Sequence, residues 1–266
     1  MTEEEAAAAA REANERCYAD GRATRTYVVD PYHAVRRQLI GEALLGAVDV
    51  DVGRAGTDGA AAGRAVARPA APLLELGCGA ESIFDQLPEL GRPTIVADLS
   101  WSALAEQKAG RHHRIQLDVT RPLPLADRSV AAVVAAELIE HLFRPQALLA
   151  EIARVLRPGG VLVLSTPNLA TLQDRFRFLF GRSPRQVDPM HEYLYLHIRP
   201  FTAQMLRRML AACGFVDVSI RSNFVGISVG RDRWLQSRLL ARLFPGLGGS
   251  LVVSARRAAG RGEEKG

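Results

Sequence analysis

The sequence predicts an α/β protein with a Rossmann-like, doubly wound sheet of seven mostly parallel strands and helices on both faces. Two observations predict this fold. Short strands alternate with helices between residues 72 and 220, and most of these strands are continuous apolar runs. Such runs are typical of parallel sheets, because helices cover both of their faces.

The first 71 residues are predicted to form an N-terminal extension that is partly helical and partly flexible. Residues 1–22 are rich in Ala, Glu and Arg, which indicates a loose helix or a disordered arm. Residues 32–48 carry apolar side chains at helical spacing, which predicts a helix with one side facing the core. Residues 49–72 are rich in Gly, Ala, Asp and Pro without periodicity, which indicates a flexible linker.

The folded domain is expected over residues 72–257, and its first half alternates strands with helices. The expected elements are a strand at 72–77, a helix near 80–87, a strand at 93–98, a helix at 101–110, and strands at 114–118 and 129–136. Each strand is short and apolar, and each is bounded by glycine, proline or polar residues. This pattern is typical of consecutive strand–helix units in one parallel sheet.

The second half of the domain continues the alternation. A strongly amphipathic helix is expected at 145–156, and the turn RPGG at 157–160 ends it because proline and glycine do not continue a helix. A strand at 161–165 follows. The remaining elements are a helix at 202–212 and strands at 215–220 and 250–254, the last two of which could form an antiparallel edge.

Two segments do not fit the alternation. Residues 168–200 are too long for a plain connection, which predicts a lid. Residues 175–182 interleave arginine with phenylalanine, and with Tyr193 and Tyr195 they could roof an acceptor pocket. The apolar run LLARLF that follows Trp234 could be another lid helix or a weak membrane-surface or dimer contact. Residues 258–266 are predicted to form a disordered tail.

Composition restricts the class of protein and its partners. The chain of 266 residues has a net charge of +5 and 48% hydrophobic residues, which is ordinary for a globular protein. Its arginines are scattered rather than gathered in one segment, which argues against nucleic acid as a partner. Three cysteines without CxxC spacing predict neither a disulfide framework nor a zinc ribbon. The cytoplasm is the expected location.

No stretch of the sequence is expected to cross a membrane or to direct secretion. The chain opens with acidic residues and a run of only five alanines. The longest uncharged run, residues 161–173, contains Pro167 and Asn168 and is too short to span a bilayer. A soluble protein is therefore expected, and the sequence does not indicate its oligomeric state.

The ends of the first three strands predict a nucleoside-binding edge. Gly77 and Gly79 allow a tight turn and the close approach of a ligand. A dinucleotide-binding fingerprint requires a third glycine where Ser82 stands, which disfavours a nicotinamide cofactor. Asp98 closes the second strand nineteen residues after Gly79, where a carboxylate would accept both ribose hydroxyls. Asp118 closes the third strand and could accept from an adenine amine.

Three acidic residues at these strand ends favour a positively charged ligand. Glu75, Asp98 and Asp118 would line one edge of the sheet. S-adenosylmethionine has the ribose and the adenine, lacks a pyrophosphate, and carries a sulfonium and an ammonium group that carboxylates attract. Each acid alone could equally be a helix cap or a turn residue, but three of them in register with the glycine loop favour this cofactor.

The motifs ELGCG, VADLS, QLDVT, AELIEHL and RVLRPGGVLVLSTPN resemble those of class I S-adenosylmethionine-dependent methyltransferases. The resemblance covers about residues 72–220, includes HIRPFT at 197–202, and is to the small-molecule O-methyltransferase branch. It places Glu75, Gly77 and Gly79 at the methionine end of the cofactor, Asp98 at the ribose, and Asp118 with Val119 at the adenine. Cys78, Leu99 and Glu137 complete the residues expected to bind the cofactor.

The sequence departs from the family pattern at two places. Glu81 stands where the family usually has a glycine, which narrows the loop. Val130 and Ala131 stand where the fourth strand usually begins with Phe-Asp. Neither departure affects the positions expected to contact the ribose or the adenine.

The segment AELIEHL follows the fourth strand and allows three interpretations. In the first, Glu137 lines the cofactor pocket, Glu140 orients an imidazole, and His141 is the general base that deprotonates an acceptor hydroxyl. In the second, these three residues and His197 hold a divalent metal such as Mg²⁺, Mn²⁺ or Zn²⁺. That set resembles metal-dependent small-RNA 2′-O-methyltransferases and ubiquinone-biosynthesis O-methyltransferases. In the third, Glu140 and His141 only cap the next helix.

The sequence therefore predicts an enzyme that moves a methyl group from S-adenosylmethionine to a hydroxyl of a small metabolite, a glycan or a lipid-like acceptor. An amine or a carbon is a less favoured acceptor atom. The alternatives are a metal-dependent RNA 2′-O-methyltransferase and a non-catalytic S-adenosylmethionine-binding module. His141 and Glu140 are the predicted catalytic residues. His191 and the pair His112 and His113 are interpreted as surface or packing residues.

Overall fold

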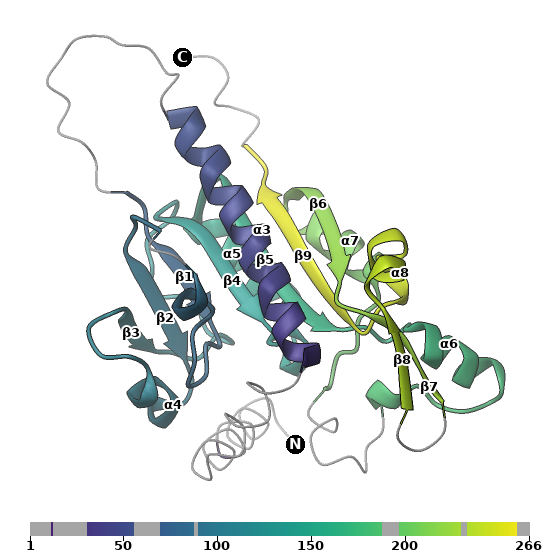
Figure 1. The fold of residues 1–266 in the computed structure, drawn as a ribbon. Helices are drawn as coiled ribbons and strands as arrows, with labels where there is room; N and C mark the ends of the chain where they lie inside the picture. The colour runs from purple at the N-terminus through teal and green to yellow at the C-terminus, as the bar shows by residue number, and fades with distance from the viewer. Residues whose placement is uncertain are drawn as a thin grey trace, which may run out of the picture.

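A seven-stranded sheet with the strand order β3-β2-β1-β4-β5-β9-β6 forms the centre of the fold (Figure 1). The computed structural model describes residues 12, 31–55, 70–87, 90–187, 197–229 and 233–259. The strands of the sheet are β1 (Leu73–Leu76), β2 (Thr94–Asp98), β3 (His113–Gln116), β4 (Val130–Ala136), β5 (Leu156–Pro167), β6 (Phe215–Ser222) and β9 (Ser250–Arg257).

The direction of the strands confirms the predicted, mostly parallel sheet. Strands β1 to β5 pair in parallel, whereas β9 is antiparallel to both of its neighbours, β5 and β6. The antiparallel strand therefore lies inside the sheet and not at its edge. The order reverses between β1 and β4, which is the point where open α/β sheets bind ligands.

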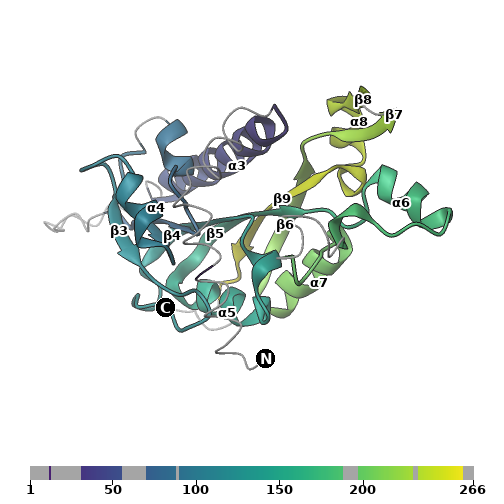
Figure 2. The ribbon, with the colours of Figure 1, turned by 90° about the horizontal axis from the view of Figure 1, so that it is seen from below.

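Helices cover both faces of the sheet (Figure 2). One face is covered by α3 (Pro31–Ala55), the short 3₁₀ helix η1 (Ile83–Gln86) and α4 (Trp101–Glu106). The other face is covered by α5 (Pro145–Val155) and α7 (Ala203–Ala212). Successive residues of β1 point to opposite faces, so Leu73 packs under α3 whereas Leu74 joins the core below α5.

The helix α5 illustrates how the sequence pattern becomes buried surface. Pro145 occupies its first turn, where the missing backbone N–H costs nothing. Its buried apolar side chains recur three and four residues apart and all face the sheet, at Leu148, Leu149, Ile152 and Val155. Each such side chain contributes about 1.5–3 kcal/mol by leaving water.

Several elements differ from the expected bounds. The helix α3 continues to Ala55, into the segment predicted as a linker, and the helix expected near 80–87 is the 3₁₀ helix η1. Strand β5 begins at Leu156, so the predicted RPGG turn belongs to it through a bulge opposite β4. A Cβ at Gly160 would lie 2.8 Å from the carbonyl oxygen of Arg157 and 3.0 Å from that of Ala131, so only glycine fits this bulge.

The region after β5 contains further elements, of which only α8, in the run LLARLF, was named from the sequence as a possible helix. They are α6 (Leu172–Leu179), η3 (Arg185–Val187), β7 (Val225–Val229), β8 (Arg233–Ser237), α8 (Arg238–Leu243) and η5 (Pro245–Leu247). The predicted lid therefore contains a helix, while its residues 188–196 lie outside the described residues. The arm at 1–22, apart from residue 12, and the tail from residue 260 lie outside them as well. None of the described helices has the length and apolar character that crossing a bilayer requires.

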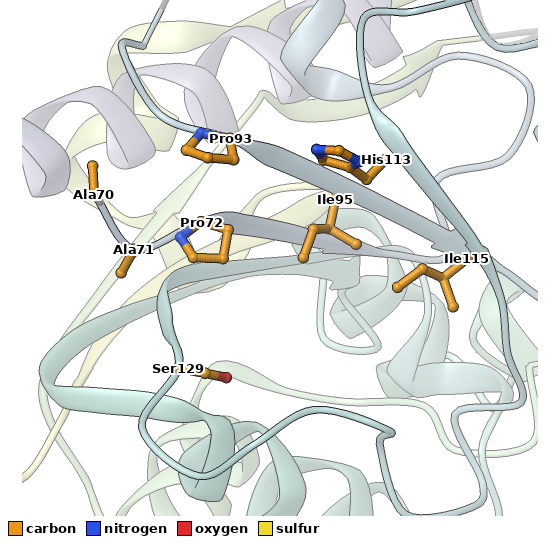
Figure 3. A pocket seen from close by; sticks show the side chains of 8 residues that line it. All are labelled: Ala70, Ala71, Pro72, Pro93, Ile95, His113, Ile115 and Ser129. Atoms are coloured by element: carbon orange, nitrogen blue, oxygen red, sulfur yellow. The ribbon is translucent and has the colours of Figure 1, made fainter. Parts of the chain in front are cut away.

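An apolar hollow of about 470 Å³ lies near the amino-terminal ends of β1 and β2 (Figure 3). Its walls are Ala70, Ala71, Pro72, Pro93, Ile95, His113, Ile115 and Ser129. Parallel sheets of this kind bind their ligands at the opposite, carboxyl ends of the strands. The hollow also has no carboxylate that could bind a ribose, so it is not the site predicted from the sequence.

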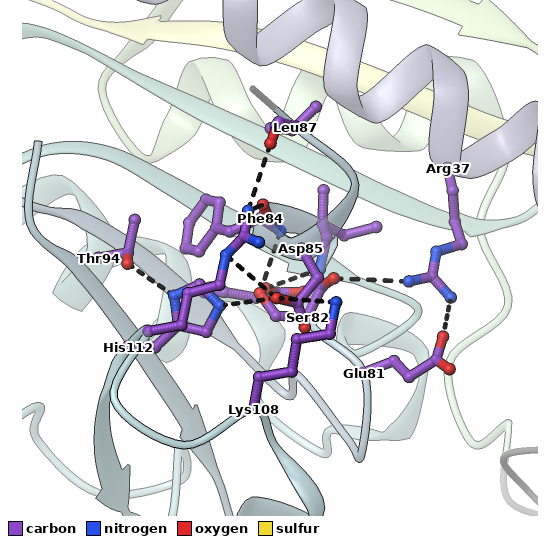
Figure 4. Close-up of polar contacts among 12 residues, drawn as sticks. Arg37, Glu81, Ser82, Phe84, Asp85, Leu87, Thr94, Lys108 and His112 are labelled. Atoms are coloured by element: carbon purple, nitrogen blue, oxygen red, sulfur yellow. Dashed lines mark hydrogen bonds and ion pairs between the residues drawn. The ribbon is translucent and has the colours of Figure 1, made fainter. Parts of the chain in front are cut away.

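A polar cluster fastens η1 to the strands beside it (Figure 4). One oxygen of Asp85 lies 3.2 Å from Nε of Arg111 and 3.3 Å from Nε2 of His112. The other ring nitrogen of His112 lies 2.7 Å from the hydroxyl of Thr94 on β2. His112 is thus a packing residue, as the sequence interpretation held. On the other side of η1, Arg37 of α3 contacts Glu81 at 3.2 Å.

A buried carboxylate in β1 secures the loop that follows this strand. Glu75 accepts hydrogen bonds from the hydroxyl of Ser82 at 2.5 Å and from the backbone N–H of Ile83 at 3.1 Å. Ser82 in turn accepts from the N–H of Phe84 at 3.0 Å and caps η1. Burial raises the pKa of Glu75 to about 7 although these hydrogen bonds oppose the shift. The hydroxyl of Ser82 is therefore the hydrogen-bond donor that the buried carboxylate of Glu75 requires. The glycine of a dinucleotide-binding fingerprint could not supply this donor.

We expect Glu75→Gln to make the free energy of unfolding less dependent on pH between about 4.5 and 7. The raised pKa means that the folded state binds the Glu75 proton more tightly than the unfolded chain does. This contribution is complete below pH 4.5 and is lost as the pH rises through 7, with a size of about 3 kcal/mol. Denaturant unfolding of both proteins at several pH values measures it.

The matched control is Glu106→Gln, which changes an exposed glutamate of α4. It should follow the wild-type pH dependence. Parallel curves for Glu75→Gln and the wild type would contradict the raised pKa.

Candidate active site

The loops after β1 and β2 are joined at the carboxyl edge of the sheet. Gly77 and Gly79 adopt φ angles of 69° and 58°, in the left-handed region that favours glycine. The turn brings the N–H of Gly79 within 2.9 Å of Oδ2 of Asp98. The N–H of Ser100 donates to the other oxygen of Asp98, also at 2.9 Å. The nineteen-residue spacing of Gly79 and Asp98 thus corresponds to a direct contact.

The carboxylate of Asp98 is fixed in place at the carboxyl edge of the sheet. Its side chain is largely buried, and each of its oxygens accepts one of these backbone hydrogen bonds. This strand end is where a carboxylate binds the ribose in nucleoside-binding α/β folds. The geometry of Asp98 therefore fits the role that the sequence predicts for it.

Gln107 supports the glycine loop and was not predicted from the sequence. It is buried, and its amide donates to the carbonyl oxygen of Gly79 at 2.7 Å. Cys78, between the two glycines, is also buried, and burial raises the pKa of its thiol. Its neutral thiol packs against the sheet with residues of the α3 face.

Asp118 lies beyond the end of β3, which stops at Gln116 instead of reaching residue 118. One of its carboxylate oxygens accepts from the N–H and the hydroxyl of Thr120, at 2.9 and 2.6 Å. These contacts correspond to the turn role that the sequence left open for each acid. The N–H of Leu117 donates to the carbonyl oxygen of Asp98 at 3.0 Å, so Asp118 stays close to that strand end. An adenine contact by Asp118, Leu99 or Val119 stays a prediction.

Glu137, at the exit of β4, is held by an arginine from the N-terminal helix. Its φ of 50° is uncommon for a residue with a side chain and indicates backbone strain. Strained residues are often found at functional sites. One carboxylate oxygen accepts from the hydroxyl of Ser165 at 2.8 Å. The other lies 2.9 Å from Nη1 of Arg36, a buried residue of α3. Sequence reasoning missed Arg36, because no local pattern connects it to a residue so far along the chain.

Glu140 is the buried carboxylate of this edge that has no hydrogen-bond partner in the described part of the chain. Its side chain is 1% exposed, and neither oxygen has hydrogen-bond geometry with another described residue, although the nearby Thr166 and Arg36 act to lower its pKa. Burial, and then the negative charge of Glu137, raise the pKa of Glu140 well above its usual range. An unpartnered buried carboxyl is costly, so its retention points to a functional role.

His141 and His197 lie beside Glu140. His141 ends the short 3₁₀ helix η2 (Ile139–His141), and its ring lies edge-on to that of His197 with 5.0 Å between the centroids. One nitrogen or oxygen atom from each of Glu140, His141 and His197 lies within 4.8 Å of the others. The N–H of Arg199 donates to the carbonyl oxygen of Glu140 at 3.0 Å, which holds the segment of His197 against η2.

These contacts distinguish the three interpretations of AELIEHL. The structure brings three of the four proposed metal ligands together, whereas the carboxylate of Glu137 is engaged by Arg36 and Ser165. Helix capping is wrong for the following helix, because the N-cap of α5 is Arg144 and no side chain caps it. The general-base interpretation and a metal site formed by three residues remain.

Comparison with known proteins agrees with this geometry. Residues 74–164 match a family model described as a methyltransferase domain. A probable S-adenosylmethionine-dependent methyltransferase of Mycobacterium tuberculosis is 34% identical over 156 residues, 58% of this chain and 52% of that protein. A demethylmenaquinone methyltransferase of Mycolicibacterium paratuberculosis is 32% identical over 170 residues, 60% of this chain and 74% of that protein.

The fold has counterparts among solved structures. The chain solved in complex with the Haloferax volcanii Trm112 methyltransferase activator is 15% identical, with a TM-score of 0.59. The match covers 92% of this chain and 98% of that chain. The chain spans about half the length of the Mycobacterium tuberculosis relative but most of the demethylmenaquinone methyltransferase. The chain belongs to the class I S-adenosylmethionine-dependent methyltransferases.

Proposed function

We propose that this methyltransferase acts on a hydroxyl of a small metabolite, a glycan or a lipid-like acceptor, with an amine or a carbon as the less favoured acceptor atom. The observation that carries the proposal is the group of Glu140, His141 and His197 beside the carboxyl edge of the sheet. A hydroxyl is a poor nucleophile until its proton is removed, and an imidazole at this place can remove it. Neither the family model nor the named relatives favour an RNA acceptor.

The chain's own residues divide the work between binding and proton transfer. The bound cofactor supplies a methyl group that its sulfonium already activates. Asp98 binds the ribose, and the loop of Gly77 and Gly79 lets the backbone approach the cofactor. The aligned attack of the acceptor oxygen then depends on positioning. His141 takes the hydroxyl proton, and Glu140 positions the imidazole.

The raised pKa of Glu140 suits this positioning role. Burial and the charge of Glu137 favour the protonated form of Glu140, and a protonated carboxyl can donate a hydrogen bond as well as accept one. The negative charge of Glu137 helps to keep the proton on Glu140, and Nη1 of Arg36 lies 2.9 Å from the carboxylate of Glu137. The cytoplasm stays the expected location and a small molecule the expected partner.

We expect Asp98→Ala to weaken the binding of S-adenosylmethionine by about 10- to 100-fold. A hydrogen bond from a ribose hydroxyl to a charged oxygen contributes about 1.5–3 kcal/mol, so the loss of one such bond accounts for a weakening of this size. Calorimetric titration of the protein with the cofactor measures the effect. The control is Asp217→Asn, an exposed residue of β6 at a φ of 53°, which asparagine tolerates. Unchanged binding by Asp98→Ala would contradict the ribose contact.

We expect His141→Ala to lower the rate of methyl transfer by about 10²- to 10⁴-fold while leaving cofactor affinity unchanged, because a general base contributes in that range. The assay follows labelled methyl groups from the cofactor into metabolite, glycan and lipid extracts. His113→Ala, which changes an exposed histidine of β3, is the control. Full activity of the His141→Ala protein would show that His141 is not the general base.

A divalent cation is a second candidate for the same group of residues. The buried oxygens of Glu140 have no partner with hydrogen-bond geometry in the described part of the chain, and a cation would coordinate them and offset the buried charge. Ligands that bind one ion at about 2.0–2.3 Å lie at most roughly 4.6 Å apart. The observed limit of 4.8 Å among the three ligand atoms fits such a site after a small closure. Carboxylate and imidazole ligands suit Mn²⁺ or Zn²⁺.

We expect about one equivalent of metal to remain on the protein after incubation with MnCl₂ or ZnCl₂ and desalting, if this second candidate holds. Glu140→Gln and His197→Ala should each lower the metal content by 10-fold or more, since each removes one of three ligands. Elemental analysis measures the content independently of activity, and Glu106→Gln is the control. If the wild-type protein holds no metal and still transfers methyl groups at the full rate, the metal site is wrong and His141 acts as a base without a metal.

A further inference from the structure

One end of the molecule is formed by elements that do not belong to the main sheet. Helix α6, the β7–β8 hairpin and helix α8 lie side by side there (Figures 1 and 2). Both helices pack against β7, and the N–H of Ser228 in β7 donates to the side chain of Gln173 in α6 at 3.4 Å. We call the outer side of these elements, including Phe180 and Arg182 after α6, the apolar–arginine surface.

This surface carries most of the large apolar side chains that are exposed in the described part of the chain. Phe178 is 71% exposed and Phe180 is 75% exposed, and Leu239 of α8 is 66% exposed. Leu179 and Leu243 are exposed to a similar extent. Exposed apolar side chains gathered on neighbouring elements mark interaction sites, whereas scattered ones do not.

The charge on this surface has one sign. Arg175, Arg182, Arg238 and Arg242 are exposed. Among the described residues of α6, η3, the hairpin and α8, the only acid is Asp174. Asp174 is buried and already contacts Arg185 at 3.2 Å. Within the described residues of these elements, no exposed carboxylate therefore neutralises the positive charge of the surface.

We infer that the apolar–arginine surface docks on an anionic phospholipid bilayer. Exposed phenylalanine and leucine side chains interleaved with arginines are typical of elements that lie in the membrane interface, where apolar groups enter the acyl boundary and cations meet the lipid phosphates. The protein lies on the bilayer and does not span it. This inference does not rest on the proposed acceptor or on the general base.

The charge pattern favours a bilayer over the other occupants of such a surface. In a symmetric dimer the same surface would face itself and bring its arginines together, which is unfavourable. Single-stranded nucleic acid could stack on the exposed phenylalanines, but the exposed leucines of α6 and α8 offer no ring and would stay in water. An anionic bilayer complements both the leucines and the arginines.

The surface is firmly connected to the active-site edge. Helix α6 follows β5 directly, and β5 carries Ser165, which contacts Glu137. The side chain of Asn168, between β5 and α6, donates to the carbonyl oxygens of Gly246 and Gly248, at 3.0 and 2.7 Å. Asn168 thus ties the start of α6 to the chain that follows α8, so both helices keep a fixed position relative to the site.

Sedimentation with lipid vesicles tests the inference on the full chain. We expect the protein to bind phosphatidylcholine vesicles that contain phosphatidylglycerol, to bind pure phosphatidylcholine vesicles far more weakly, and to be released by salt. Each arginine near an anionic membrane contributes a factor of about five in affinity. The double variant Arg238→Gln/Arg242→Gln should therefore bind about 25-fold more weakly.

The apolar part is tested by Phe178→Ser/Phe180→Ser, which should weaken binding by at least about 10-fold, since two phenylalanines no longer enter the membrane. Both residues are exposed, so the fold should persist, and circular dichroism checks it. The control variants Arg208→Gln and Met205→Ser change exposed residues of α7, outside this surface, and should bind like the wild type.

Three results would overturn the inference. One is a wild-type protein that does not sediment with anionic vesicles. Another is equal binding by the surface variants and the α7 controls. The last is a dimer or an RNA complex of the wild type that the surface variants abolish while vesicle binding is absent, which would assign the surface to that partner. Because vesicle binding needs no methyl transfer, a wrong acceptor or a wrong base would leave these results unchanged.

Discussion

The burial of carboxylates along one edge of the sheet is the constraint on which the rest of the site depends. A buried carboxylate is tolerated only where donors or cations meet it. Glu75 is met by Ser82 and Ile83, and Asp98 by two backbone N–H groups. Glu137 is met by Arg36 and Ser165. Each partner comes from another element, so the contacts to these carboxylates also fix the loops at the carboxyl edge of the sheet.

This constraint explains why the N-terminal helix is part of the site. Helix α3 lies across the sheet face, with Ile40 and Leu44 fully buried against it. Its arginine pair reaches two different loops, because Arg36 contacts Glu137 after β4 and Arg37 contacts Glu81 near η1. Glu81, which stands where the family usually has a glycine, therefore has a structural partner. Through these two contacts the helix joins the loops that follow β1 and β4.

Patterns within short stretches of the sequence predicted the strands and turns that depend only on residues close together in the chain. The apolar runs gave β1, β2 and β4, and the glycine loop predicted both the turn and the position of Asp98. Contacts between distant segments left no such pattern. Arg36 looks like any charged residue of an amphipathic helix, and Gln107 like an ordinary polar residue near a helix end. The β7–β8 hairpin was missed because its strands are short and only one of their faces packs against the protein.

The same electrostatics favour catalysis with a charged cofactor. Arg36 balances Glu137, whereas no cation in the described residues balances Glu140 as directly. The acidic edge consequently attracts a positively charged sulfonium more strongly than the neutral thioether that remains after methyl transfer. A proton on Glu140 reduces the excess of negative charge at this edge, and a positive charge on the imidazole of His141 would reduce it as well. If His141 deprotonates an acceptor hydroxyl, as proposed, the new positive charge arises beside these carboxylates, which stabilise it.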